Sequence, residues 1–165
     1  GKQKNNTMKT TLEEAKENSH EDIVNHLQQL LEKNYDAEAG YKKAMTDADS
    51  SQLKNFLKQQ AVLRNRFATE LDKEIRDLNE TPKEKGSVTG SLHRTWIDIK
   101  TAVTGNDDEA VLEECIRGEK ASVSEYEDAL TNQQFPPKIQ HTLTKQVDEV
   151  KATLHKVKSL EDLKD

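Results

Sequence analysis

One pattern of residues occurs twice in this chain, 85 positions apart. The first copy is Leu27, Leu30, Leu31, Asn34, Tyr41, Ala44 and Met45, and the second copy is Leu112, Cys115, Ile116, Glu119, Tyr126, Ala129 and Leu130. The apolar members of each copy recur every three or four residues, which is the period of one face of an α-helix. Two copies of a helical hairpin leave such an echo, so the pattern predicts a four-helix bundle with a pseudo-two-fold axis.

The composition agrees with long, largely solvated helices. Of the 165 residues 34% are charged and 32% are hydrophobic, against roughly 25% and 45–50% in an average globular protein. The formal net charge of -6 is spread along the chain. Without a cluster of Lys and Arg, we expect no nucleic-acid binding, because neutralising phosphates requires concentrated positive charge. No run of 18 apolar residues occurs, so we also expect no membrane-spanning segment.

The periodic segments predict four helices, at about 19–46, 51–79, 107–132 and 137–160. Ser19 is a plausible N-cap for the first of them, since its side chain can accept a hydrogen bond from a backbone N–H of the first turn. Pro137 fits the first turn of the last helix, where no N–H is needed. We therefore predict an all-α chain made of two hairpins.

The connection between the two predicted hairpins is long and has a pattern of its own. Residues 80–107 contain Pro82 and three glycines, yet Leu92, Trp96, Ile99 and Val103 recur at helical spacing. We expect a short helix at about 91–104 that lies across the bundle, with Trp96 closing one end of it. Two short hairpin turns joined by one long crossover is the ferritin-like order of connections.

The ends of the chain are less constrained. Residues 1–18 are polar and lack an apolar period, so we expect a polar tail that is disordered or loosely helical, followed by a single bundle domain over 19–162. The chain begins with Gly1 and no Met, and we expect that natural residues before it have been removed. The compartment stays open: it is cytoplasmic or, if a signal was removed, periplasmic or that of a lipoprotein.

Five segments resemble a known family. They are residues 30–44, the spaced Arg64, Phe67, Glu70 and Leu71, residues 86–100, residues 112–130 and the Pro136-Pro137 turn. Over about residues 20–160 the chain resembles a family of bacterial ferritin-like four-helix-bundle proteins that carries only an unknown-function label. The part around His93-Arg94-Thr95-Trp96 is the most specific. The resemblance implies the bundle fold, a bacterial origin, a link to stress response and no established reaction.

The echo places a polar residue, Asn34 or Glu119, in the middle of each inner stripe. In di-iron carboxylate bundles a Glu at this position is followed by Glu-x-x-His on the next helix, roughly 33 and 36 residues further on. The six corresponding positions here are Asn34, Phe67, Glu70, Glu119, Ala152 and His155. Two are hydrocarbon and one is an amide, so the pattern argues against a di-iron centre and against ferroxidase or peroxidase chemistry.

Two interpretations of Glu119 remain. In the first, Asn34, Arg64 or a tyrosine hydroxyl holds its carboxylate in a polar layer that fixes the register of the helices. In the second, Glu119, Glu70 and His155 converge on a single metal ion with Asn34 as a weak fourth ligand. The first interpretation predicts no cofactor. The second predicts a single-metal site with fewer ligands than a di-iron centre has.

Other residues receive structural assignments. Cys115 lies on an apolar stripe and is expected to be a small core residue, and Glu38 is expected to pair with a basic residue of a neighbouring helix. Val24, Val62 and Leu63 lie outside the main stripes and suggest a homodimer interface. We predict a non-enzymatic interaction or stress-associated module. The alternative is a metal-binding or oxidoreductase protein that uses Glu119, Glu70 and His155.

Overall fold

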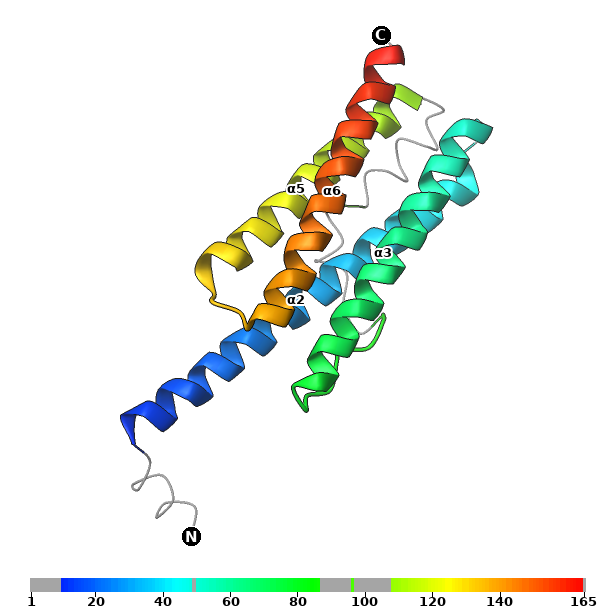
Figure 1. The fold of residues 1–165 in the computed structure, drawn as a ribbon. Helices are drawn as coiled ribbons and strands as arrows, with labels where there is room; N and C mark the ends of the chain where they lie inside the picture. Colours follow the sequence, from blue (N-terminus) through cyan, green and yellow to red (C-terminus); the bar gives the residue numbers. More distant parts are fainter. Residues whose placement is uncertain (1–9, 49, 87–95, 97–107, 165) are drawn as a thin grey trace.

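The computed structural model describes residues 10–48, 50–86, 96 and 108–164. Its regular elements within these ranges are four α-helices: α2 (Thr11–Asp47), α3 (Ser51–Asp77), α5 (Asp108–Asn132) and α6 (Pro137–Lys164). Figure 1 shows α2 and α3 side by side as one antiparallel hairpin and α5 and α6 as the other. The predicted all-α chain of two hairpins is confirmed. Across the described ranges no helix is both long and apolar enough to cross a membrane.

The ends of α3 follow from local chemistry. The Ser50 side chain accepts a hydrogen bond from the backbone N–H of Leu53 at 3.3 Å, which satisfies one free donor of the first turn. At the other end Asn79 has a φ of 63°, and the N–H groups of Asn79 and Glu80 bond to the carbonyls of Arg76 and Ile75. This is a Schellman ending, with Asn in the left-handed position that glycine usually fills.

The predicted start of the first helix is wrong. Instead of beginning near Ser19, α2 begins at Thr11, and Thr10 is its cap through a 3.1 Å bond to the N–H of Glu13. Glu13 and Glu14 in the first turn favour a helix start, because carboxylates stabilise the positive end of the helix dipole. Residues 11–19 are exposed, so this part has no apolar stripe by which periodicity could find it. The division into a tail of 1–18 and a domain of 19–162 stays a prediction.

Two apolar clusters form the core, and a layer of polar side chains lies between them. One cluster includes Leu27, Leu31, Phe67, Leu71, Ile75, Tyr126 and Leu143. The other includes Tyr41, Ala44, Leu57, Trp96, Leu112, Cys115 and Val157. The first-copy residue Leu27 lies in one cluster and its second-copy equivalent Leu112 in the other, as a two-fold axis perpendicular to the bundle would place them.

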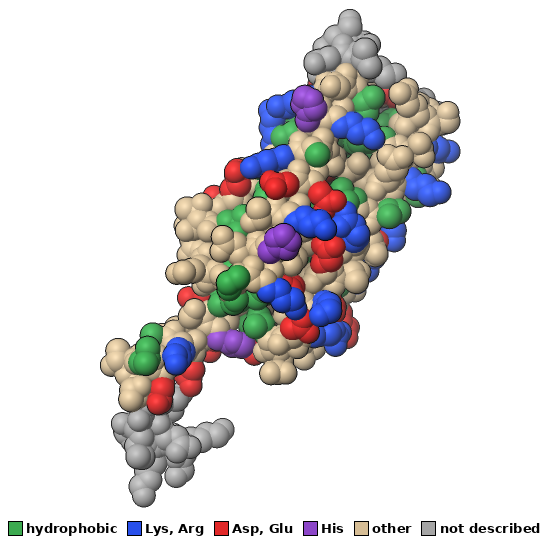
Figure 2. Space-filling view, in the orientation of Figure 1, with side chains coloured by type: hydrophobic (Ala, Val, Ile, Leu, Met, Phe, Trp, Pro, Cys, Tyr) green, Lys and Arg blue, Asp and Glu red, His purple; other side chains and the backbone are tan. Residues whose placement is uncertain are grey.

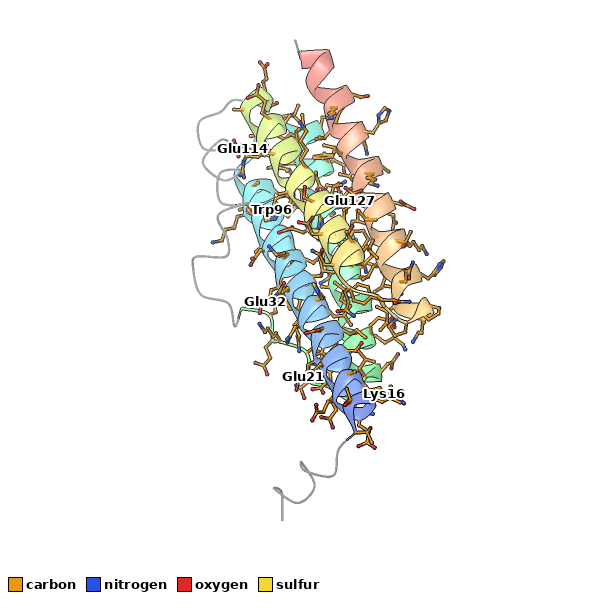
Figure 3. All side chains as sticks on the ribbon, turned by 90° about the vertical axis from the view of Figure 1, so that its left-hand side faces the viewer. Lys16, Glu21, Glu32, Trp96, Glu114 and Glu127 are labelled. Atoms are coloured by element: carbon orange, nitrogen blue, oxygen red, sulfur yellow. The ribbon has the colours of Figure 1, made fainter. Side chains whose placement is uncertain are left out.

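The described part of the crossover runs along α2. Gln28 donates to the carbonyl of Thr81 and accepts from the N–H of Lys83, and further along α2 Lys85 lies 2.7 Å from Glu38. Of the predicted helix at 91–104, only Trp96 lies within the described residues, where it is helical. Its predicted position at an end of the bundle is wrong. Figure 3 shows Trp96 beside α2 and α5, and it lies against Gly40 and Gly118, about two turns from the end of α2 and about three turns from the start of α5.

Candidate functional site

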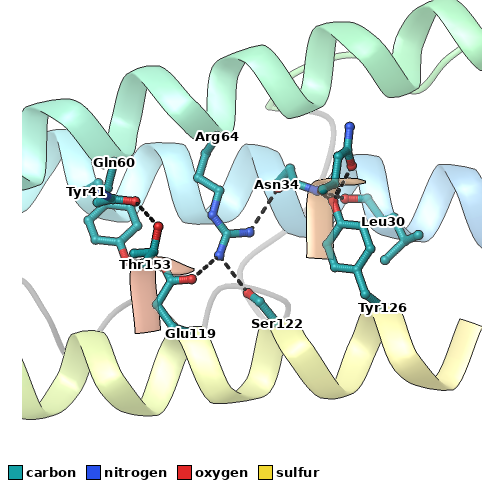
Figure 4. A network of polar contacts seen from close by, with 10 residues as sticks. Leu30, Asn34, Tyr41, Gln60, Arg64, Glu119, Ser122, Tyr126 and Thr153 are labelled. Carbon is teal, nitrogen blue, oxygen red and sulfur yellow. Dashed lines mark hydrogen bonds and ion pairs between the residues drawn. The ribbon is translucent and has the colours of Figure 1, made fainter. Parts of the chain in front are cut away.

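A buried ion pair forms the centre of the polar layer (Figure 4). Arg64 comes from α3 and Glu119 from α5, and their side chains are 2% and 0% exposed. One guanidinium nitrogen of Arg64 donates to Glu119 Oε2 at 2.7 Å and to Ser122 Oγ at 3.0 Å. The other carboxylate oxygen of Glu119 accepts a hydrogen bond from the hydroxyl of Tyr41. Protein donors therefore bind both oxygens of this carboxylate.

The layer continues from Arg64 to the fourth helix. Arg64 also donates to Asn34 Oδ1 at 3.0 Å, and the amide nitrogen of Asn34 donates to the Tyr126 hydroxyl at 3.0 Å and to the carbonyl of Leu30 at 2.8 Å. Tyr126 in turn donates to Gln146 Oε1 at 2.5 Å. One connected network thus joins α2, α3, α5 and α6. Such a network fixes the relative register of the helices, because sliding one of them leaves buried polar groups unpaired.

The charges in this layer stabilise each other. Burial is the largest influence on the Arg64 guanidinium and alone would lower its pKa, but the charge and hydrogen bond of Glu119 together with Tyr41 and Tyr126 outweigh it, so the pKa lies above its ordinary value. Burial and then the charge of Glu119 raise the pKa of the Tyr41 hydroxyl well above its ordinary value. Burial likewise raises the pKa of Tyr126. Both tyrosines therefore stay protonated and act as hydrogen-bond donors.

An aromatic side chain from the crossover covers the ion pair. The guanidinium carbon of Arg64 lies 5.5 Å from the centre of the Trp96 ring, and the Trp96 and Tyr41 rings lie 5.0 Å apart. Two glycines make room for Trp96. A Cβ at Gly40 would come within 2.8 Å of Trp96, and a Cβ at Gly118 within 2.6 Å. The absence of side chains at these two positions, one in each hairpin, is what lets Trp96 reach the layer.

The contacts between α2 and α5 are reciprocal. Tyr41 of the first repeat bonds to Glu119 of the second, and Tyr126 of the second repeat bonds to Asn34 of the first. Since the shift of 85 residues matches Tyr41 with Tyr126 and Asn34 with Glu119, each tyrosine bonds to the polar residue of the other copy. A pseudo-two-fold axis between the two helices produces this exchange.

The contacts between α3 and α6 follow the same rule at a shift of 86. Thr153 donates to Gln60 at 3.2 Å, and the amide of Gln146 donates to the carbonyl of Phe67 at 3.3 Å. Gln146 lies 86 positions after Gln60, and Thr153 lies 86 positions after Phe67. The repeat therefore extends over both helices of each hairpin, with one additional residue in the second copy.

The structure places the four predicted metal ligands in three different surroundings. Glu119 and Asn34 lie in the polar layer, and Arg64 joins them. Glu70 accepts hydrogen bonds from Gln146 at 2.8 Å and from Arg66 at 3.2 Å, and His155 is exposed. Among the described residues no three His, Cys, Asp or Glu side chains gather as a metal-binding group. The metal hypothesis stays a prediction, although the ligands it needs are not together here.

Of two further sequence predictions, the burial of Cys115 is confirmed and the partner expected for Glu38 is wrong. Cys115 is fully buried, as predicted, and burial raises the pKa of its thiol. Burial alone would also raise the pKa of the Glu38 carboxyl, but Lys85, Lys42 and Asn65 lower it below its ordinary value. The expected partner of Glu38 on a neighbouring helix is wrong, because its lysines come from the crossover and from α2 itself.

The proposed dimer residues also differ from one another. Val62 is 64% exposed, whereas Val24 is buried and Leu63 is partly buried against the core. Of the three, only Val62 therefore presents much apolar surface to a partner. The homodimer itself stays a prediction.

The sequence pattern does not indicate three features of the layer. They are Ser122, Gln146 and the glycine seat, which is the pair Gly40 and Gly118 that leaves room for Trp96. A signal for Gln146 existed in the 86-residue shift that matches it with Gln60. The glycine seat carried no signal, because the side chain that fills it comes from a distant segment.

The comparisons with known proteins add one finding. No curated protein matches the chain. The model of the family described as "Domain of unknown function (DUF2383)" matches residues 22–132, which is more than half of the chain and includes α3 and α5 entirely. The chain belongs to this DUF2383 family.

Proposed function

We propose that this protein is a ferritin-like four-helix bundle of bacterial origin that acts as a non-enzymatic interaction or stress-associated module. The bacterial origin and the stress association rest on the family resemblance alone. The two hairpins joined by a long crossover support the ferritin-like assignment. The non-enzymatic role rests on the polar layer.

The observation that carries this proposal is the saturation of Glu119. Tyr41 and Arg64 bind its two carboxylate oxygens, and the positive charge of Arg64 balances its negative charge. A metal cation beside Glu119 would have to displace Arg64 or lie next to a like charge in a low-dielectric interior, where such repulsion is strong. The group best placed for chemistry is therefore already used in holding the helices together.

The alternative is a metal-binding or oxidoreductase protein that uses Glu119, Glu70 and His155, and elemental analysis separates the two functions. The protein is purified without a metal-affinity tag, incubated with Fe(II), Mn(II) or Zn(II), and then desalted. We expect no stoichiometric metal in the wild type, and the same result for Glu70→Gln and His155→Ala. These two variants remove the other two ligands that the alternative needs, while the ion pair of Arg64 and Glu119 stays intact.

A contrary result would be unambiguous. Stoichiometric metal in the wild type that is lost in Glu70→Gln, in His155→Ala and in Glu119→Gln would overturn the proposal and establish the alternative. The circular-dichroism spectrum of each variant shows whether a loss of metal merely reflects a loss of fold.

A further inference from the structure

Two large hydrophobic side chains are strongly exposed on the described surface. Leu12 is 65% exposed and Val62 is 64% exposed. Leu12 lies in the first turn of α2, and Val62 lies in the middle of α3. Single exposed apolar residues are common on soluble proteins, so the surroundings of each one decide whether they have a meaning.

Val62 lies in a shallow apolar groove with a basic rim. The groove encloses about 320 Å³ between α2 and α3, and its lining consists of Glu38, Lys42, Met45, Lys58, Ala61, Val62 and Asn65. The one acid there, Glu38, is already paired with Lys42 and Lys85. From residue 51 to 69 the sequence of α3 contains no acidic residue. The groove therefore suits an apolar side chain that has acidic neighbours.

Leu12 has those acidic neighbours. Residues 11–22 contain five carboxylates against one lysine: Glu13, Glu14, Glu17, Glu21 and Asp22 against Lys16. Figure 2 shows this part of α2 extending beyond the bundle, with acidic side chains on its surface. Residues 11–19 are exposed on all sides. The segment is thus an acidic helix with one prominent apolar residue, and no described part of the chain covers it.

The segment cannot reach the groove of its own chain. Leu12 and Lys42 lie on the same continuous helix, and at 1.5 Å per residue their separation along the axis is about 45 Å. Contact between them within one molecule would require α2 to break and fold back. If this segment fills the groove, it must therefore come from another molecule.

We propose that the groove binds the N-terminal segment of α2, residues 11–17, from a second copy of this chain. Leu12 packs against Val62, Met45 and Ala61, and its glutamates face Lys42 and Lys58. Each copy carries both halves of the contact, so two copies form it twice in a closed pair. This inference rests on the proposed interaction role and gives it a partner.

Sedimentation equilibrium of the untagged full-length chain tests the docking over a range of concentrations and at two salt concentrations. We expect a monomer–dimer equilibrium that weakens as salt is raised, because the charges are exposed. Leu12→Ser and Val62→Ser should each raise the dissociation constant about a hundred- to ten-thousandfold, because the contact forms twice and each variant dimer loses the burial of two aliphatic side chains. Lys145→Glu, an exposed charge reversal on α6, is the matched control and should have no effect.

Two further measurements make the test specific. Lys58→Glu should weaken the dimer, and adding Glu13→Lys and Glu14→Lys to the same chain should restore it. An equimolar mixture of the Leu12→Ser and Val62→Ser chains should pair more tightly than either alone, because one intact segment then meets one intact groove.

A monomer at all concentrations would overturn the docking, and so would a dimer that none of these substitutions affects. Neither outcome bears on the metal content, so failure of this inference is distinguishable from failure of the proposed absence of a metal site. The substituted side chains are exposed, and unchanged thermal melting would show that each variant is folded.

Discussion

In the hairpin α2–α3 the inner face of the second helix carries Arg64, whereas the equivalent position of the hairpin α5–α6 carries Val150, 86 residues later. The first helices of the two hairpins differ in the opposite way, because α2 carries the neutral Asn34 and α5 carries the acidic Glu119 at the equivalent position. The two hairpins thus share a frame, but only one of them supplies the cation and only the other supplies the anion. Neither hairpin alone can neutralise its own charge, so the ion pair makes the two halves depend on each other.

A second difference concerns the seam between α2 and α5. Gly40 and Gly118 leave room for Trp96, and the 85-residue shift matches these glycines with Glu125 and Lys33. Lys33 and Glu125 form an ion pair with each other. One half of the seam is therefore bridged by two long side chains of the bundle, and the other half receives an aromatic ring from the crossover. The repeat supplies the architecture, and departures from it create the distinctive features.

The largest effect is expected when the charge asymmetry is broken on one side only. Arg64→Val copies the residue of the other hairpin but leaves Glu119 buried and unpaired, which typically costs about 3–5 kcal/mol. The double variant Arg64→Val with Glu119→Asn makes the two hairpins alike and removes both charges. We expect it to recover a large part of the loss, because replacing a whole buried pair is often close to neutral. Urea unfolding followed by circular dichroism measures both.

The same experiment has a clear contrary outcome. If the double variant loses as much free energy of unfolding as the single variants Arg64→Val and Glu119→Asn lose together, then Arg64 and Glu119 are not coupled. In that case the ion pair would not be the reason for the dependence between the two hairpins.

The two equivalent tyrosines offer a smaller and sharper comparison. Tyr41→Phe removes a hydrogen bond to a carboxylate, whereas Tyr126→Phe removes bonds to the neutral amides of Gln146 and Asn34. The two neutral bonds contribute about 1–3 kcal/mol together, close to the about 1.5–3 kcal/mol of one hydrogen bond to a charged group. Tyr41→Phe also leaves a buried carboxylate oxygen of Glu119 without this donor, and an unsatisfied buried group costs more when it is charged. We expect the greater loss of unfolding free energy in Tyr41→Phe. Equal losses of unfolding free energy would mean that the charge of Glu119 does not strengthen its hydrogen bond with Tyr41.

Adding a side chain in the glycine seat should lower the free energy of unfolding by about 1–3 kcal/mol, the usual cost of overpacking. In Gly118→Ala the new methyl group would overlap the Trp96 ring, which must shift. Because Trp96 is the one tryptophan of the chain, its fluorescence reports this movement directly, and we expect a red shift as the ring meets water. Ser124→Ala, at an exposed position of the same helix, is the control and should leave the spectrum unchanged.

The sequence was sufficient to predict what periodicity encodes. The bounds of α3 and α5 were predicted to within two residues, as were the start of α6 and the burial of Cys115, because buried positions recur at helical spacing whatever their partners are. A polar layer around Glu119 was one of the two interpretations of that residue. Arg64 and a tyrosine hydroxyl were among the partners considered for Glu119, and both bind it. The sequence did not predict which polar side chains of the layer bond to one another, because several of them could pair equally well from these buried positions.

The errors have a common physical cause. The first eight residues of α2 are exposed and carry no apolar stripe, so only the cap at Thr10 and the acidic first turn with Glu13 and Glu14 mark their helical state. The helical spacing of the crossover predicts Trp96 at an end of the bundle. Its real position depends on two glycines far apart in the chain, and spacing within one segment does not encode such a contact.

The smallest effect concerns a contact between the hairpins at the surface. A carboxylate oxygen of Asp77, at the end of α3, lies 2.8 Å from the side-chain nitrogen of Lys138 at the start of α6. Hydrogen bonds from Lys138 and Lys73 lower the pKa of the Asp77 carboxyl from 3.8 to about 2. A lowered pKa means that the ionised form stabilises the folded state above pH 3.8, and that this contribution disappears as the pH falls through about 2. Asp77→Asn should therefore lower the melting temperature slightly at pH 6, and the difference from the wild type should vanish near pH 2. A difference that persists at pH 2 would show that the side chain acts through packing instead of charge, and an NMR titration of the Asp77 carboxyl measures the pKa directly.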